Sequence, residues 1–298
     1  MGLSSWLELT ALVDSGDAEV VASAMGRFGH GGAAIEEERG GGPPSQAGKA
    51  RVRAFIPVDD LLPGRRAEME RALSQLRLRC PVELSPRTVD DQEWETIWRA
   101  HFPVLAVGRR LVVKPSWEEH RARRGQVVLE IDPGMAFGTG HHATTRLCLV
   151  ALERHLAPGM AVLDVGTGSG ILAIAAAKLE ASAVAALDIN PVAVDVARSN
   201  IASNGVAGVV SVELGGLPFE RPLGPFDIVM ANILSTVVCE LAPHLAGALR
   251  PRGVLVASGF IDVHCPEVSE RLRQEGLAVV ETMAEGDWRA LVAVREEG

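Results

Sequence analysis

The sequence predicts an α/β protein in which a largely parallel, doubly wound sheet follows a small α+β module of the ferredoxin-like type. Three observations predict this fold. From about residue 142 the chain alternates apolar strands with helices, a glycine-rich turn at 166–170 joins one strand to the next helix, and the first 85 residues have a β-α-β-β-α-β order of their own. We therefore expect a small domain at 1–85, a linker region at 86–125 and the main domain at 126–298.

The small domain has the pattern of four strands and two helices. Helical spacing covers 65–79 and a segment from Asp17, which can cap it, to about Phe28. A loop rich in glycine and proline occupies 39–45. Nothing in this domain suggests catalysis, so we expect it to recognise a substrate or, with similar weight, to have a structural or dimerising role. Strand-like alternation covers 6–13, 33–36, 50–58 and 82–84.

The linker region begins with two tryptophans, Trp94 and Trp98, whose spacing places them on one face of a helix. Two strand-like runs follow, at 111–114 and 127–131. Between them lies a basic stretch that Glu118-Glu119 interrupts and that has few aromatic residues. We interpret this stretch as a solvated hairpin edge and not as an RNA-binding groove.

The main domain repeats helix and strand in alternation. A parallel sheet of this kind binds its ligand beyond the carboxyl ends of its strands. Pro191 suits the first turn of a helix, and 277–281 with 291–294 can close an antiparallel edge hairpin. The expected helices are 144–155, 171–179, 191–204 and 236–249, and the expected strands are 161–165, 183–188, 209–213, 227–231 and 254–258.

Composition places the chain among ordinary globular proteins, with 298 residues of which 47% are hydrophobic and 22% charged. The net charge of −9 disfavours non-specific binding to nucleic acid. The four cysteines are scattered and form no C-x-x-C pair, which argues for reduced thiols and against a zinc site. There is neither a signal-peptide pattern nor an apolar run long enough to span a bilayer. We expect a cytoplasmic monomer without a metal, a membrane partner or a nucleic-acid partner.

The glycine turn Gly166-x-Gly168-x-Gly170 is the most informative motif, because it stands between an apolar strand and a helix. Its spacing is one residue tighter than the dinucleotide pattern G-x-G-x-x-G. Asp188 ends the next strand, eighteen residues past Gly170, where a carboxylate can accept hydrogen bonds from ribose hydroxyls. Asp164 precedes the turn; it would repel a pyrophosphate but attract the amine or sulfonium of S-adenosylmethionine (SAM). The motif therefore favours SAM, with a close strand–helix crossing as the alternative.

A second glycine-rich segment, Asp132 to Thr145, precedes the first helix of the main domain. Its Gly138 and Gly140 free the backbone to fold over a ligand, and Phe137 can shield the site from water. Thr144 or Thr145 can cap the helix and bond a polar end of the ligand. The adjacent histidines, His141-His142, lack further ligands at zinc spacing, so we expect them to face solvent or to support the site.

Asn232 closes the strand that begins near Asp227, at the carboxyl edge of the sheet. Its amide oxygen can accept a hydrogen bond from an amine and direct the nitrogen lone pair toward a methyl group. The alternative is that Asn232 only caps the next helix. Its place opposite the glycine turn favours a role in catalysis.

Together these motifs resemble the class I SAM-dependent methyltransferases and, among them, the ribosomal protein L11 methyltransferases, which modify the stalk-base protein of the large ribosomal subunit. The resemblance implies a Rossmann-like methyltransferase domain. It implies SAM as cofactor, with catalysis at Asn232 and cofactor contacts at Thr145, Gly166, Gly168, Asp188 and Asn232. The stretches that carry it are 132–146, 162–172, 188–198, 204–206 and 232–234, with further likeness at 94–98 and 114–118.

The expected reaction is transfer of the SAM methyl group to amines, both lysine side chains and the N-terminal α-amine, of the ribosomal stalk-base protein. No Tyr occurs in the chain and no Pro-Pro-Tyr follows Asn232, which disfavours a glutamine methyltransferase of release factors. A lysine methyltransferase of another protein, such as electron-transfer flavoprotein, is the alternative. Two further alternatives are an NAD-dependent dehydrogenase and a non-enzymatic ribosome-binding module.

Overall fold

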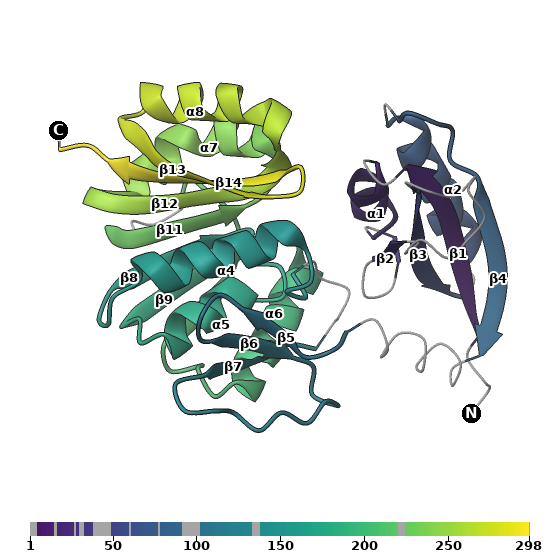
Figure 1. The fold of residues 1–298 in the computed structure, drawn as a ribbon, viewed down its shortest axis with the longest axis horizontal. Coiled ribbons are helices and arrows are strands. Elements are labelled where there is room, and N and C mark those ends of the chain that lie inside the picture. Colours follow the sequence, from purple (N-terminus) through teal and green to yellow (C-terminus); the bar gives the residue numbers. More distant parts are fainter. Residues whose placement is uncertain are drawn as a thin grey trace. The chain divides into compact units, whose positions relative to one another are not determined.

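The computed structural model describes residues 5–14, 17–26, 28–29, 33–37, 49–59, 61–76, 78–90, 102–132, 138–219 and 224–297. These residues divide into two compact units, the first ending at Phe102 and the second beginning at Pro103 (Figure 1). The glycine- and proline-rich loop 39–45, Trp94, Trp98 and Phe137 lie outside the described residues.

The first unit is an antiparallel sheet of order β2-β3-β1-β4 with two helices packed on one face (Figure 1). It confirms the predicted β-α-β-β-α-β order. Alternate strand residues such as Leu9 and Val52 join Met25 and Met69 from the helices in one buried core. The elements are β1 (Ser5–Asp14), α1 (Ala18–Gly26), β2 (Ala33–Glu37), β3 (Lys49–Pro57), α2 (Leu62–Ser74) and β4 (Leu84–Asp90).

Two predictions in the first unit need correction. The helix expected at 65–79 is α2, which ends at Ser74, and the last strand, expected at 82–84, runs from Leu84 to Asp90. Most residues of β4 are exposed, so its sequence lacks the alternation that marks a half-buried strand. Pairing with β1 forms it, and Pro86 is tolerated because β4 is an edge strand.

The second unit contains a seven-stranded sheet of order β10-β9-β8-β11-β12-β14-β13 (Figure 1). The first five strands are parallel, and β14 and β13 add an antiparallel hairpin at one edge, as predicted. The strands are β8 (Ala161–Val165), β9 (Ala183–Asp188), β10 (Val210–Leu214), β11 (Phe226–Asn232), β12 (Leu249–Ile261), β13 (Leu277–Glu285) and β14 (Trp288–Arg295).

Helices cover both faces of this sheet, which makes the domain doubly wound. One apolar cluster joins the sheet to α4, α5 and α6, and a second joins its other face to α7 and α8. The helix α8 was not predicted, because only Val268 and Leu272 of it are buried. The helices are α4 (Ala143–His155), α5 (Ile171–Lys178), α6 (Pro191–Ser203), α7 (Ser235–Ala248) and α8 (Cys265–Gln274).

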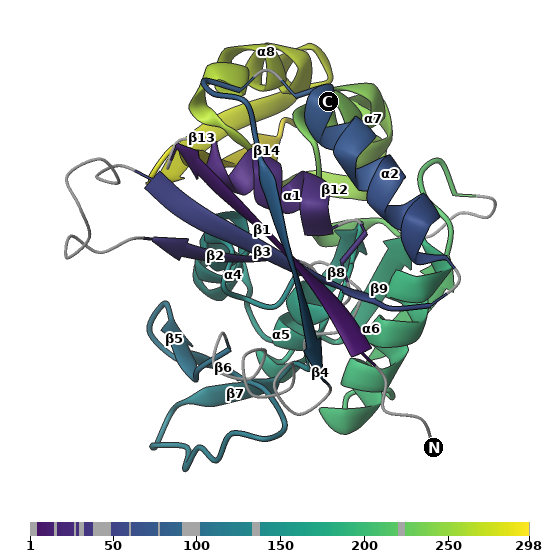
Figure 2. The same ribbon diagram turned by 90° about the vertical axis from the view of Figure 1, so that its right-hand side faces the viewer.

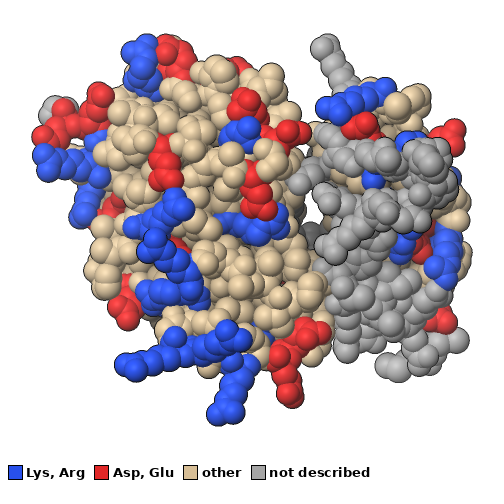
Figure 3. All heavy atoms as spheres, viewed as in Figure 1, with Lys and Arg blue, Asp and Glu red and all other residues tan. Residues whose placement is uncertain are grey.

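The region expected as a linker contributes strands to the second unit. A three-stranded sheet of order β5-β6-β7 forms from β5 (Leu105–Val107), β6 (Leu111–Lys114) and β7 (Val127–Glu130), and β5 was not predicted. The strand β7 adjoins α5 (Figure 2). Basic side chains gather at this end of the second unit (Figure 3), where Arg121, Arg123 and Arg124 are exposed between β6 and β7.

None of the helices within the described ranges combines the length and apolar character needed to cross a membrane. The four cysteines are unpaired thiols.

Candidate active site

The glycine turn adopts the conformation that its residue type predicts. Gly166, Gly168 and Gly170 have φ angles of +73°, +56° and +83°, a region that other residues enter only with strain. A Cβ on Gly166 would lie 2.5 Å from Cγ2 of Ile233, so the segment after β11 passes directly against the turn. The turn is therefore left-handed at its three glycines, and the Ile233 side chain occupies the space that a Cβ of Gly166 would need.

Asp188 ends β9 beside the glycine turn. Its Oδ2 accepts a hydrogen bond from the Gly168 N–H at 2.9 Å, and its Oδ1 accepts one from the Asn190 N–H at 2.9 Å. Each carboxylate oxygen keeps a second lone pair for a further donor. The adjacent Ile189 is 82% exposed, so an apolar side chain is accessible to solvent next to this acceptor.

Asn232 and Thr145, which are 87 residues apart in the chain, meet at the carboxyl end of β11. The Asn232 Nδ2 group donates to Thr145 Oγ1 at 3.4 Å, and Thr145 is fully buried. The Asn232 Oδ1 atom is buried and has no hydrogen-bond partner among the described residues. Leu234, not Asn232, is the N-cap residue of α7. The interpretation of Asn232 as a helix cap is therefore wrong.

Asp164, the carboxylate before the turn, is completely buried. Its Oδ2 accepts a hydrogen bond from Thr167 Oγ1 at 2.6 Å, whereas its Oδ1 has no partner in the described part of the chain. Burial raises the pKa of Asp164 to about 6; hydrogen bonding from Thr167 and from the Ala173 backbone opposes this rise, and the nearby charge of Asp188 adds to it. A buried acceptor with a free lone pair is suited to a positively charged or hydrogen-bonding group.

The glycine-rich loop before α4 is attached to the same turn. Gly138 has a φ of +107°, and its carbonyl accepts a hydrogen bond from Ser169 Oγ at 2.5 Å. The amide of Asn200 on α6 donates to the Ser169 carbonyl at 2.9 Å, which ties α6 to this contact. Neither Ser169 nor Asn200 was predicted as a site residue, because their role depends on helices and loops that are distant in sequence.

The two histidines support the loop. His142 is the N-cap of α4, where its Nδ1 accepts the Thr144 N–H at 3.3 Å, so the prediction that Thr144 or Thr145 caps this helix is wrong. The His141 ring lies 3.3 Å from the carbonyl oxygens of both Thr139 and Pro103. Burial lowers the pKa of His141, which favours its neutral form.

The site residues predicted from sequence thus gather at one edge of the sheet. The Asp188 carboxylate contacts Gly168, the Asn232 amide contacts Thr145, and Gly166 lies against the residue after Asn232. Two carboxylates, Asp164 and Asp188, and the amide oxygen of Asn232 lie at the carboxyl ends of β8, β9 and β11, which is where ligands bind in open α/β sheets.

Comparison with known proteins agrees with this geometry. The profile of a family described as ribosomal protein L11 methyltransferase (PrmA) matches residues 5–296. A ribosomal protein L11 methyltransferase of Pelotomaculum thermopropionicum is 44% identical, covering 97% of this chain and 98% of the relative. One from Chloroflexus aurantiacus is 40% identical over the whole of both chains. The crystal structure of ribosomal protein L11 methylase from Lactobacillus delbrueckii subsp. bulgaricus matches with a TM-score of 0.60 and 33% identity, over 65% of this chain and 98% of that one.

Proposed function

The chain belongs to the ribosomal protein L11 methyltransferase family, and from this premise we propose that it transfers methyl groups from SAM to amines of ribosomal protein L11 in the cytoplasm. The amines are lysine side chains and the N-terminal α-amine. One observation carries the chemistry: the buried Oδ1 of Asn232, which has no hydrogen-bond partner among the described residues, lies where β11 meets the glycine turn and Thr145.

The residues around the turn fit SAM. Two buried acceptors, Asp164 Oδ1 and Asn232 Oδ1, lack partners among the described residues, and both lie close to the glycine turn in the chain or in space. When bound, SAM supplies an electrophilic methyl group on a positively charged sulfonium. The Asp188 carboxylate would accept hydrogen bonds from the ribose hydroxyls, and Asp164 would attract the positive charge of the methionine part.

The chain's contribution to the reaction is to bind and orient a neutral amine. The Asn232 Oδ1 atom accepts an amine N–H, which directs the nitrogen lone pair away from the amide and toward the methyl group. An α-amine, with a pKa of about 7.7–8.0, is partly neutral at pH 7, whereas a lysine near 10.4 must be desolvated to lose its proton. We assign no side-chain base; the chain has no Tyr, and water takes the proton.

Intact-mass spectrometry tests the function. Unmodified recombinant ribosomal protein L11, incubated with the full-length protein and SAM, is expected to gain mass in whole methyl units, and fragmentation then assigns the amines. Electron-transfer flavoprotein, incubated in parallel, is expected to stay unchanged. If L11 gains no mass while calorimetry shows SAM bound, the substrate assignment is wrong; a gain on the flavoprotein alone would favour the alternative.

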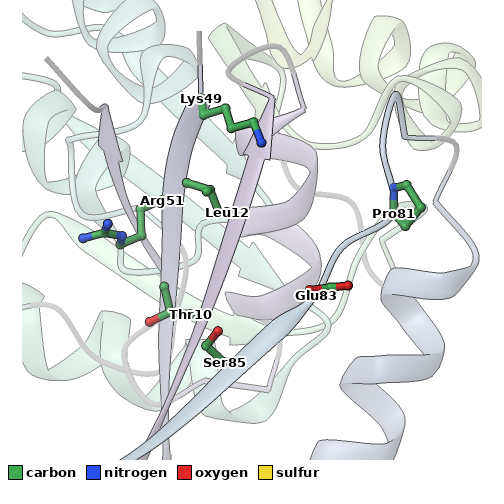
Figure 4. Close-up of a pocket in the computed structure, with 7 residues that line it drawn as sticks. All are labelled: Thr10, Leu12, Lys49, Arg51, Pro81, Glu83 and Ser85. Atoms are coloured by element: carbon green, nitrogen blue, oxygen red, sulfur yellow. The ribbon is translucent and has the colours of Figure 1, made fainter. Parts of the chain in front are cut away.

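We further propose that the first unit recognises the substrate protein. Its two helices cover one face of the sheet, and the opposite face carries a hollow between β1, β3 and β4 (Figure 4). Leu12 and Thr10 of β1 face this hollow because they alternate with the core residues of the strand. A polar surface with an aliphatic side chain at its centre suits a protein surface as partner. The lining residues are Thr10, Leu12, Lys49, Arg51, Pro81, Glu83 and Ser85.

Substituting Leu12→Glu tests this recognition surface. We expect the KM for L11 to rise by roughly tenfold, the scale for losing one important interface residue, because a carboxylate in the hollow must be desolvated on docking. Steady-state kinetics with L11 varied measures this, and the Kd for SAM should not change. Val20→Glu is the matched control, since Val20 is exposed on α1, on the covered side of the sheet. An unchanged KM for Leu12→Glu would place recognition elsewhere.

A further inference from the structure

Arg146, in the first turn of α4, connects three parts of the second unit. Its Nε donates to both carboxylate oxygens of Glu285, at 2.9 and 3.2 Å, and its Nη2 donates to Glu285 as well. Its Nη1 donates to the carbonyl oxygen of His141. One guanidinium therefore links the end of β13 to the loop that leads into α4.

Trp288, which pairs with Glu285 across the β13–β14 hairpin, makes a second contact with the same end of the helix. The rings of Trp288 and His142 are edge-to-face, with centroids 4.7 Å apart and an interplanar angle of 70°. Because His142 caps α4, this contact and the Arg146–Glu285 pair both hold the helix N-terminus against the tip of the β13–β14 hairpin.

The chain neighbours of these two contact residues belong to the candidate site or to its loop. Thr145 directly precedes Arg146, is fully buried, and accepts the hydrogen bond from Asn232. His141 continues the loop whose Gly138 carbonyl is bonded to Ser169 of the glycine turn. A shift at Arg146 would therefore move both Thr145 and the loop.

We propose that Arg146 is a positioning residue for SAM binding, and that it acts by bridging Glu285 to the His141 carbonyl. It touches neither the amine nor the methyl group in this role. The ion pair is partly exposed, with side chains 27% and 41% accessible, so it contributes little to stability. Its effect lies in fixing the loop, and misplacement of binding groups by about 1 Å is enough to reduce activity by orders of magnitude. This inference rests on the proposed use of SAM.

Exchanging the two charged residues distinguishes the bridge to the His141 carbonyl from the ion pair that attaches α4 to β13. In Arg146→Glu with Glu285→Arg the ion pair between α4 and β13 can re-form, but a glutamate cannot donate to the His141 carbonyl. We expect the double variant to keep an unfolding midpoint close to that of the wild type yet bind SAM roughly tenfold more weakly by calorimetry. Arg146→Lys, which can still donate, should retain part of the affinity, and kcat at saturating SAM should fall less than affinity.

The control is a second ion pair between the same elements. Arg154 near the end of α4 donates to Glu281 of β13 at 2.7 Å, so Arg154→Gln removes a comparable contact far from the loop. Its SAM affinity should equal that of the wild type. Wild-type affinity in Arg146→Gln, or full recovery of affinity in the charge exchange, would overturn the inference. Failure of the wild type itself to bind SAM would instead contradict the proposed function.

Discussion

Asn232→Ala is expected to leave the Kd for SAM within about tenfold of the wild type while reducing turnover by roughly 10²–10³, the range for losing one preorganised hydrogen-bonding group. The reason is that the Oδ1 atom, buried and without a partner among the described residues, serves the incoming amine more than the cofactor. Alanine removes the acceptor that orients the nitrogen lone pair. Calorimetry measures the binding of SAM, and single-turnover methylation of L11 measures the chemical step.

Asn204→Ala is the control for Asn232. The Asn204 amide donates to the Glu130 carbonyl at 2.6 Å and helps to hold β7. Its loss should lower the free energy of unfolding and leave turnover at the wild-type level. Equal losses of SAM affinity and turnover in Asn232→Ala would show that Asn232 is only a cofactor contact.

Gly166→Ala is expected to have the second-largest effect, a loss of both SAM affinity and turnover. The φ of +73° costs an alanine about 1–2 kcal/mol. In addition, the new Cβ would lie 2.5 Å from Cγ2 of Ile233, the residue after Asn232, so the turn or the Asn232 segment must move. We expect SAM to bind at least roughly tenfold more weakly, because the backbone turn and the amide are displaced together.

Gly205→Ala distinguishes the collision from backbone strain. Gly205 has a φ of +69°, close to that of Gly166, but a Cβ there would meet no atom within 4 Å. This control should lose stability by the same strain and keep SAM affinity. If Gly166→Ala and Gly205→Ala bind SAM with the same affinity, the contact between residue 166 and Ile233 does not affect SAM binding.

Much of the fold follows from local pattern. The strand–glycine–helix sequence at 161–178 and the alternation through β12 predicted the parallel sheet, because short apolar runs bounded by turn residues mark buried strands and the glycine turn marks the start of a helix. The exposed edge strand β4, the short β5 and the mostly exposed α8 lack those signals. The strand β4 forms by pairing with β1 and α8 packs on α7, both distant in sequence, whereas β5 pairs with the neighbouring β6.

The candidate site residues also fall into two groups, those that a local pattern predicts and those that depend on contacts distant in sequence. Gly166, Asp188 and Asn232 each stand at the end of a strand, and parallel strands bring their carboxyl ends to one edge, so their proximity was predictable. The cap formed by His142 and the bridge formed by Arg146 were not. The bridge depends on the β13–β14 hairpin, whose Glu285 lies 139 residues beyond Arg146, and the ring of the capping His142 packs against Trp288 of the same hairpin.

The sequence by itself determined the alternation of strands and helices in the parallel sheet, the left-handed turn and the side chains that end its strands, since these depend on apolar patterning and on the φ freedom of glycine. Only the tertiary structure decided which polar atoms are satisfied. It pairs Thr145 with Asn232 Nδ2, and it leaves the Oδ1 atoms of Asn232 and Asp164 without partners among the described residues. The physical reason is that hydrogen bonding between side chains depends on distances of a few tenths of an ångström across separate elements, which no local pattern encodes.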